Sequence, residues 1–429
     1  MVHRELDLVD MHIDLTMNDG LLLFEITLEE DEPNECKSEM VSTSFYVQGP
    51  HDWSLDEIHP DHLALSSLLV VRPWFNKTLS FSFPVSHRFS EACKAMNINV
   101  QPVGENIDPY DTMQGNYIAL AYSGGADSTA ALSVLPPSTI PIFLDRPITQ
   151  GSLYSKEAAL SSCNKLIQLG YNCQIIPCDL EAIRKPIGFP TDLANGVPAI
   201  LLASRLNIFG IAYGTVLESL YGMGRLMFKD YVTTNHYANW WDVFSSAGLP
   251  LSFPTGGISE VGTELICSKS GIGKLAQSCI RGRPQEPCNF CWKCFRKQTL
   301  RAAIKTEELN ISTTLELLKS NEVCKKLEQL PISHENVLIY AFSKLDLDNY
   351  PNGFIQRFNH SDDLSYLEHW YAPSLDLIDD RIKAVTAKRI ISFIGKNGDV
   401  DEINLESWDN TTRVNRLEPL VVNSLNVIH

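Results

Sequence analysis

The sequence lacks the long apolar runs that mark membrane-spanning and secreted proteins. Its most apolar stretch, Val197 to Val216, is interrupted by Ser204, Arg205 and Asn207, whereas a membrane span needs about 20 predominantly apolar residues in succession. The first ten residues, MVHRELDLVD, contain no apolar core of the kind found in a signal peptide. We therefore expect a cytoplasmic protein with no membrane partner.

The sequence also has fewer positively charged than negatively charged residues. The 429 residues include 35 Lys and Arg against 52 Asp and Glu, which gives a formal net charge of -17. Such a chain repels a long anionic polymer unless it carries a local basic patch, so we expect no nucleic-acid partner. With 44% hydrophobic and 20% charged residues, the composition is that of a globular protein, and the length allows about two or three domains.

The cysteine count does not indicate a disulfide framework, and the N-terminal histidines do not indicate a metal site. There are 11 cysteines, and an odd count without a secretion signal favours reduced thiols over a disulfide framework. The N-terminal histidines, His51, His59, His62 and His87, are scattered without metal-ligand spacing. We expect them to be surface or capping residues.

The most informative stretch is a tight glycine turn, Ser123-Gly124-Gly125-Ala126-Asp127-Ser128. An apolar run, Tyr117 to Tyr122, precedes it and reads as a buried strand. A helix-forming run, Thr129 to Leu135, follows and stops at two prolines. A strand, a turn and a helix start bring backbone N–H groups and the positive end of a helix dipole to one place, which suits phosphate. The alternative is an ordinary strand-to-helix turn with a serine cap, which the full six-residue context disfavours.

Each residue type in this turn has a physical use. Gly124 and Gly125 let the backbone approach a ligand closely, and Ser123 and Ser128 add hydroxyl donors. Asp127 is the exception, because a carboxylate repels phosphate. It either orders the loop through backbone N–H groups or meets a Mg²⁺ that arrives with the phosphates.

From residue 113 onward, strands and helices alternate, which predicts a doubly wound, mostly parallel sheet. Residues at the carboxyl ends of such strands line the ligand crevice. Asp145 follows a predicted strand, and Gly214 and Thr215 follow another. We expect all three at a nucleotide site, with Asp145 either a ribose or adenine contact or a simple turn residue.

A second motif is formed by cysteines, at Cys279-x8-Cys288-x2-Cys291-x2-Cys294. Four thiolates satisfy tetrahedral Zn²⁺, with sulfurs at about 2.3 Å from the metal. A redox pair and an iron–sulfur cluster are the alternatives, and structural zinc is favoured because nothing nearby indicates electron transfer. Cys267 and Cys324 are the spare candidates if Cys279 is not the fourth ligand.

Three further features have more than one interpretation from the sequence alone. Glu218 could bind a ligand amine or a Mg²⁺, or be an exposed helix residue. The aromatic and polar segment Tyr221 to Trp241 suits a flat heterocycle or a self-packed surface loop. The basic stretch Arg281 to Arg301 suits pyrophosphate or another anion, or a solvated surface.

The chain divides into three expected parts. Residues 1–112 show alternating, hairpin-like patterns and predict a β-rich module; residues 113–305 hold both motifs; residues 306–429 show helical apolar spacing. The first and last parts carry no catalytic signature, so a protein partner for these accessory modules is a reasonable expectation. Self-association into a homo-oligomer is left open.

The glycine turn resembles the SGGxDS loop of the N-type ATP pyrophosphatase (PP-loop) superfamily, and it lacks the lysine of the Walker loop GxxxxGK[ST]. With the cysteines, the chain resembles the 7-cyano-7-deazaguanine synthase family over residues 115–305. The resemblance implies an adenine nucleotide alpha hydrolase-like fold, ATP held by Ser123, Gly124, Gly125, Asp127 and Ser128, and zinc held by Cys279, Cys288, Cys291 and Cys294 beside the active site.

The resemblance also implies a reaction. ATP and Mg²⁺ would activate the carboxylate of a 7-carboxy-7-deazaguanine-like substrate as an adenylate, with Asp127 and Ser128 at the catalytic site. Ammonia or the amine of a partner protein would displace AMP to give an amide or, with a second ATP, a nitrile. Such an AMP-forming ligase fits a bacterial anti-phage or nucleobase-modification system. The alternatives are a non-catalytic ATP-binding interaction module and a tRNA thiolation enzyme with the same loop.

Overall fold

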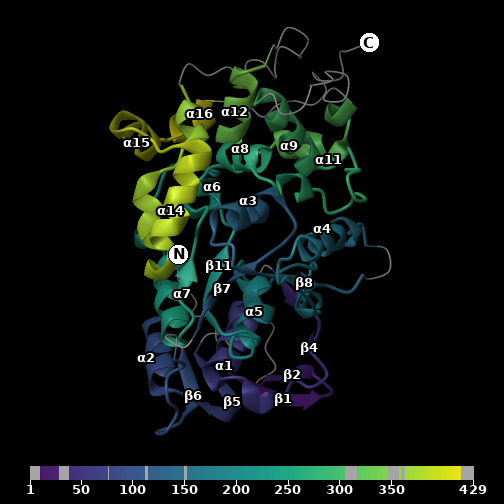
Figure 1. The fold of residues 1–429 in the computed structure, drawn as a ribbon, viewed down its shortest axis with the longest axis vertical. Coiled ribbons are helices and arrows are strands. Elements are labelled where there is room, and N and C mark those ends of the chain that lie inside the picture. The colour runs from purple at the N-terminus through teal and green to yellow at the C-terminus, as the bar shows by residue number, and fades with distance from the viewer. Residues whose placement is uncertain are drawn as a thin grey trace, which may run out of the picture.

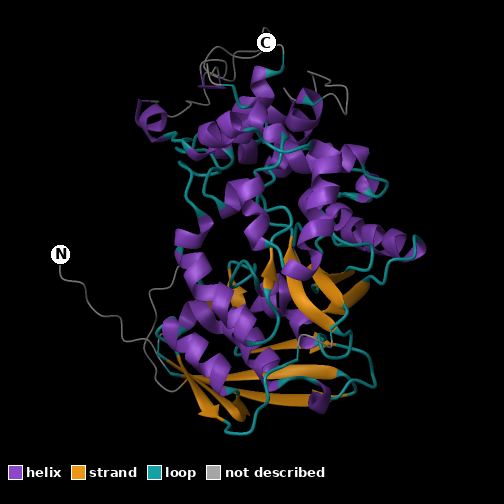
Figure 2. Cartoon of the chain, turned by 60° about the vertical axis from the view of Figure 1, so that its left-hand side comes forward, coloured by secondary structure: helices purple, strands orange, loops and turns teal. Residues whose placement is uncertain are grey.

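The computed structural model describes residues 10–28, 38–75, 77–111, 115–148, 152–304, 316–345, 357–358 and 363–416. They form a mixed α/β structure with parallel strands and helices, as expected. Figures 1 and 2 show a first sheet at the base, a second sheet in the middle and a helical region at the top. The expected part boundaries at 112–113 and 305–306 lie outside the described residues.

The first sheet has five strands in the order β4-β2-β1-β5-β6. Their bounds are β1 Met11–Asn18, β2 Leu21–Leu28, β4 Ser44–Gln48, β5 Thr78–Val85 and β6 Asn99–Val103. β1 and β2 are antiparallel and join through Asp19 and Gly20, both with positive φ, which is the geometry of a type I′ hairpin. The sheet is mixed rather than purely antiparallel, because β5 pairs in parallel with β1 and with β6.

Two helices accompany this sheet, α1 (Pro60–Val71) and α2 (His87–Ala95). Eleven of the twelve residues of α1 are buried, since the helix packs on β5 on one side and on α5 (Val197–Leu201) on the other. The expectation of a surface or capping role is confirmed for His59, which caps α1, and is wrong for His62. His62 is fully buried, and burial lowers its pKa to about 3.

The second sheet is parallel throughout, in the order β12-β11-β7-β8-β9. Its strands are β7 Tyr117–Ala121, β8 Ile140–Asp145, β9 Gln174–Pro177, β11 Ile208–Tyr213 and β12 Leu251–Ser252. The order reverses between β7 and β11, so the crevice of a doubly wound sheet opens at the carboxyl ends of these two strands. A two-stranded ribbon, β3 (Glu39–Met40) with β10 (Arg184–Lys185), links the early chain to the central region.

Side chains of β7 alternate between two apolar layers. Ile118 and Leu120 join a cluster with residues of α3 (Ala126–Val134), α4 (Glu157–Gln168), α8 (Glu260–Lys269) and α14 (Asp380–Ile394). Ala119 and Ala121 join the larger cluster that continues into the first sheet. A parallel sheet buried on both faces requires this double cover. The remaining helices of the central region are α6 Leu217–Leu220 and α7 Asn235–Ser246.

The last part of the described chain is mostly helical. Its helices are α9 Trp292–Ala303, α11 Asn321–Leu327, α12 Glu335–Ser343, α14 Asp380–Ile394, α15 Asp399–Glu406 and α16 Thr411–Arg416. Short 3-10 turns connect many elements, for example Tyr231–Thr233 and Gly273–Leu275. Among the residues that the structure describes, no helix combines the length and the apolar character that crossing a membrane requires.

Candidate active site

The glycine turn sits at the switch point of the central sheet. It leaves β7 and enters α3, whose N-cap is Gly125. Gly124 has φ +76°, and a Cβ there would also lie 3.2 Å from the Cα of Ala159, so both conformation and space require glycine. The N–H groups of the first turn of α3 are therefore next to the crevice, as a phosphate site needs.

The two loop serines face each other. The Oγ atoms of Ser123 and Ser128 are 3.1 Å apart, and the N–H of Ser123 donates to Ser128 Oγ over 3.3 Å. Gly214, at the end of β11, lies against this loop so tightly that a Cβ on it would come within 2.8 Å of Ser128 Cα. The structure thus brings together two loop serines and the Gly214 that the sequence indicated separately.

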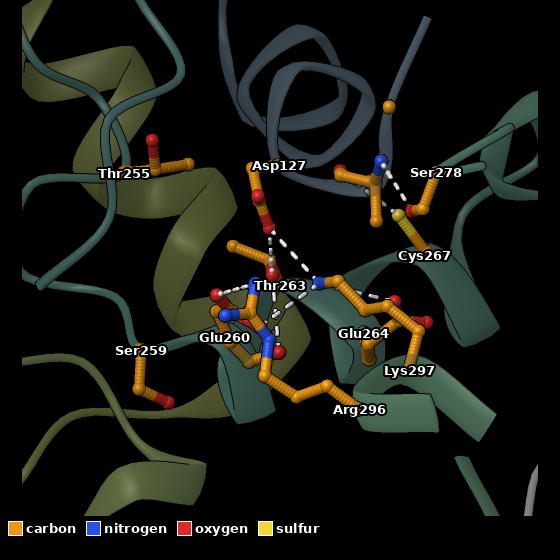
Figure 3. A network of polar contacts seen from close by, with 12 residues as sticks. Asp127, Thr255, Ser259, Glu260, Thr263, Glu264, Cys267, Ser278, Arg296 and Lys297 are labelled. Atoms are coloured by element: carbon orange, nitrogen blue, oxygen red, sulfur yellow. Dashed lines mark hydrogen bonds and ion pairs between the residues drawn. The ribbon is translucent and has the colours of Figure 1, made fainter. Parts of the chain in front are cut away.

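Asp127 connects the loop to two other helices (Figure 3). Its Oδ1 accepts a hydrogen bond of 2.8 Å from Thr263 on α8 and lies 3.3 Å from Lys297 Nζ on α9. The loop is also tied on its other side, where the N–H of Gln277 donates to the Gly124 carbonyl and Ser278 Oγ accepts from the Ala126 N–H. Side chains and backbone from three segments therefore hold the loop in place.

Beneath the loop lies a buried network of charges on α8 and α9. Glu260, only 1% exposed, lies 2.8 Å from Arg296 Nη2 and 3.5 Å from Lys297 Nζ. Glu264 lies 3.3 Å from Lys297 and 3.0 Å from Arg301 Nε. The two acids lie one turn apart on α8, and the ion pairs connect α8 to Arg296, Lys297 and Arg301 of α9.

Burial by itself disfavours the charged form of every residue in this network. The ion pairs among these residues decide in which direction each pKa shifts. Desolvation raises the pKa of Glu260, but Lys297 and Arg296 outweigh it and hold that pKa well below its usual range. Desolvation likewise lowers the pKa of Lys297, and Asp127, Glu260 and Glu264 outweigh it and raise that pKa. The solvated-surface interpretation of the basic stretch is therefore wrong for Arg296 and Lys297, which are both buried.

Glu218 is buried as well, at 1% exposure, so its interpretation as an exposed helix residue is wrong. Its carboxylate accepts from the Glu260 N–H over 3.1 Å and from Asn336 Nδ2 over 3.3 Å. Burial and the neighbouring Glu260 raise the pKa of Glu218 to about 7. The side chain belongs to the interior of the network.

The four cysteines of the second motif converge. The Sγ atoms of Cys279, Cys288, Cys291 and Cys294 all lie within 4.8 Å of one another. The Cys291–Cys294 and Cys288–Cys294 separations are 3.5 and 3.7 Å, and a tetrahedral ZnS₄ unit with bonds of about 2.3 Å has sulfurs about 3.8 Å apart. The set fits a metal such as zinc, and the spare candidates Cys267 and Cys324 lie outside it.

This cluster also begins α9. Cys291 is the N-cap of the helix, and its Sγ accepts from the Cys294 N–H. The same helix then carries Lys293, Lys297 and Arg301 at four-residue intervals, so the three cations share one face. A metal at the cysteines would therefore fix the start of the helix that carries these charges.

That helix face lines a cavity of about 660 Å³, whose wall also includes Gln277, Ser278, Cys279 and Cys294. Five of the lining residues are cationic and one is acidic; the cations are Lys274, Arg283, Lys293, Lys297 and Arg301, and the acid is Glu264. Lys293 is exposed on the wall, yet the surrounding protein desolvates its ammonium and lowers its pKa. The cavity adjoins the loop through Gln277, Ser278 and Lys297.

A second cavity, of about 430 Å³, lies at the carboxyl end of β11 and includes Thr215. Several members of the aromatic segment line it, among them Tyr231 and His236. The segment is therefore more than a loop, since it also forms most of α7. Asp145, by contrast, lines neither cavity and pairs with Lys156 at 2.8 Å.

Sequence reasoning missed several members of the site, notably Thr263, Glu264, Ser278 and His334, whose Nδ1 lies 2.7 Å from Glu260. One available signal was the pair Glu260 and Glu264, whose spacing matches that of Lys297 and Arg301. Thr263 and Ser278 have no such signal, because their roles arise from how α8 and the following turn pack on the loop.

Comparison with known proteins yields one match. A model of a family of unknown function, DUF6395, covers residues 239–409, which include α8, α9 and the cysteine cluster but not the glycine turn. No curated protein and no solved structure matches the chain.

Proposed function

We propose that this protein is an AMP-forming ligase of the PP-loop type, which adenylates a carboxylated 7-deazapurine and transfers its acyl group to an amine. The observation that carries the proposal is the cation-lined cavity of about 660 Å³ beside a glycine turn at the sheet's switch point. In a chain of net charge -17, a wall with five cations and one acid selects an anionic ligand.

Triphosphate chemistry suits this arrangement. The phosphates of ATP lie over residues 123–128, where they meet the first N–H groups of α3 and the loop hydroxyls. Within the described residues, Lys274, Arg283 and Lys293 have no ion-pair partner, so they are free to neutralise the departing pyrophosphate. The strand order of the sheet supports an adenine nucleotide alpha hydrolase-like fold within this proposal.

The expected ions have different roles. A zinc ion would be held by Cys279, Cys288, Cys291 and Cys294, and its contribution is structural, because four thiolates leave no open position. A Mg²⁺ fits less as a resident ion, since the metal-compatible cluster among the described residues is the cysteine set alone. It would arrive with ATP, and Asp127 could supply one carboxylate at most.

The chemistry divides into two balanced steps. A carboxylate oxygen of the substrate attacks the α phosphorus of ATP, the α–β phosphoanhydride bond breaks, and pyrophosphate leaves with its electron pair. An amine then attacks the acyl carbon, loses a proton, and expels AMP. Positioning and charge neutralisation supply most of the rate, as is usual for phosphoryl and nucleotidyl transfer.

The amine is ammonia or an amine of a partner protein, and the two give different products. Ammonia gives a primary amide, which a second ATP can dehydrate to a nitrile. A protein amine gives a secondary amide, which cannot be dehydrated in that way. A partner would dock on the accessory parts of the chain, and a role in bacterial anti-phage defence or nucleobase modification is consistent with either product.

The test uses the full chain with ATP, Mg²⁺ and 7-carboxy-7-deazaguanine, with hydroxylamine added as a general amine. We expect AMP, pyrophosphate and the substrate hydroxamate in equal amounts by chromatography and mass spectrometry. Ser128→Ala should lower this turnover by about tenfold or more, whereas Ser133→Ala, on the same helix but away from the loop, should not. Formation of ADP and phosphate in place of AMP would overturn the proposal.

A further inference from the structure

The cavity at the end of β11 is chemically unlike the cationic cavity. Besides Thr215, its wall combines two cations, one carboxylate and a group of apolar side chains. Its volume of about 430 Å³ is within the range of small-molecule sites. It also lies close to the glycine turn, because Gly214, which packs on Ser128, directly precedes Thr215.

The two cations are Arg225 and Lys229. Both are exposed on the wall, and neither has an ion pair or a side-chain hydrogen bond among the residues that the structure describes. Two glycines, Gly222 and Gly224, precede Arg225, and Gly222 has φ +74°, so the backbone turns just before these side chains. Two unpaired cations in one cavity provide a site for a carboxylate.

The carboxylate on the wall belongs to Asp192, and His236 holds it in place. Its Oδ2 lies 3.0 Å from His236 Nε2, and His236 Nδ1 shares a hydrogen bond of 2.8 Å with the hydroxyl of the buried Tyr231. The surrounding protein desolvates the carboxylate and raises the pKa of Asp192, but His236 outweighs this effect and leaves that pKa below its usual range. Because its side chain is 68% exposed, Asp192 can still present an ionised carboxylate to the cavity.

Apolar side chains complete the wall. Phe253, Leu220 and Met227 line the cavity together with the ring of Tyr231, which packs edge-on against Phe253 with ring centroids 5.5 Å apart. A wall of this kind holds a flat ring system, while the few polar groups fix its orientation.

We propose that this cavity binds the carboxylated substrate, a planar nitrogen heterocycle with a carboxylate on one side and an N–H donor edge on the other. The carboxylate meets Arg225 and Lys229, and the donor edge meets Asp192 through paired N–H···O bonds of the bidentate kind. The inference rests on the proposed function for the identity of the heterocycle, and it adds where and how that heterocycle is recognised.

Binding without ATP tests the inference separately from turnover. Isothermal titration calorimetry compares two ligands that share the donor edge, 7-carboxy-7-deazaguanine and 7-cyano-7-deazaguanine, of which only the first has a carboxylate. Asp192→Asn should weaken both ligands by about tenfold or more, because an amide N–H₂ then faces the donor edge. The double variant Arg225→Met with Lys229→Met should weaken the carboxylate ligand alone, to the affinity of the nitrile.

Asp242→Asn is the matched control, since it makes the same change at an exposed position of α7 that does not line the cavity. It should leave both affinities unchanged, and thermal unfolding of each variant should verify an intact fold. If Asp192→Asn bound each ligand as tightly as the wild type does, the inference would be overturned. If the affinities were unchanged but AMP were still formed, the proposed function would stand and only the binding site would be wrong. If the affinities changed as expected but no AMP were formed, the binding site would stand and the proposed function would be wrong.

Discussion

The carboxylate of Asp127 and the ammonium of Lys297 lie 3.3 Å apart although 170 positions separate them in the chain. This contact joins the start of α3 to the middle of α9, the helix that the cysteine cluster begins. The two sequence motifs are thereby parts of one site. The same lysine also pairs with Glu260 and Glu264, so its charge is shared between the loop and the buried network.

Lys297→Met should destabilise the protein. Removal of this 5% exposed lysine leaves buried carboxylates with fewer partners, and such losses cost about 3 kcal/mol or more. Chemical denaturation measures the free energy of unfolding. The control is Lys293→Met, one helical turn earlier and unpaired within the described chain, which should change that free energy by less than about 0.5 kcal/mol; equal destabilisation by both would contradict the account.

Lys293→Met should instead weaken nucleotide binding. Its ammonium lines the cationic cavity, and loss of one charge-assisted contact to phosphate costs about 1.5 to 3 kcal/mol, or about ten- to hundredfold in the Kd for ATP. Calorimetric titration with ATP at two salt concentrations measures the effect. An unchanged Kd would show that the phosphates do not reach this wall.

Metal removal should act through α9. Chelation, or Cys291→Ser, removes a thiolate of the cluster and alters the N-cap of the helix, so we expect a lower Tm and a weaker ATP affinity together. Elemental analysis of the purified protein should give about one zinc per chain. Cys324→Ser, which alters a cysteine outside the cluster, is the control and should retain the metal.

Much of this architecture follows from local patterns in the sequence. The run before the glycine turn predicts β7, the prolines after Leu135 predict the end of α3, and the C-x2-C spacing predicts the cysteine cluster. These features depend on residues close together in the chain. The parallel pairing of β1 with β5, and the burial of Glu218 and Lys297, depend on which distant elements pack together, and no local pattern contains that information.

Glu218 makes stability depend on pH. Its pKa is raised to about 7 in the folded protein, above the value of about 4.3 for an unfolded chain, so the folded state binds more protons. Stability from this group is therefore complete below about pH 4.3 and is lost as pH rises through 7, by an amount of the order of 3 kcal/mol. Denaturation midpoints from pH 5 to 8 should fall more steeply in the wild type than in Glu218→Gln; identical slopes would contradict the prediction.

Gly214→Ala should distort the glycine turn at residues 123–128 without changing its charge. The added methyl group would lie 2.8 Å from Ser128 Cα and 2.9 Å from its backbone nitrogen, so the start of α3 must shift. We expect ATP affinity to fall by about tenfold or more. Gly271→Ala, where a methyl group would meet nothing within 4 Å, is the control.

The claim on which the account depends most is that a substrate carboxylate attacks the α phosphorus of ATP held over residues 123–128. Isotope transfer measures this directly: 7-carboxy-7-deazaguanine labelled with ¹⁸O in its carboxylate is turned over with ATP and hydroxylamine, and the nucleotide product is weighed by mass spectrometry. The account predicts AMP that carries one ¹⁸O atom. Unlabelled AMP, or ADP as the product, would contradict it.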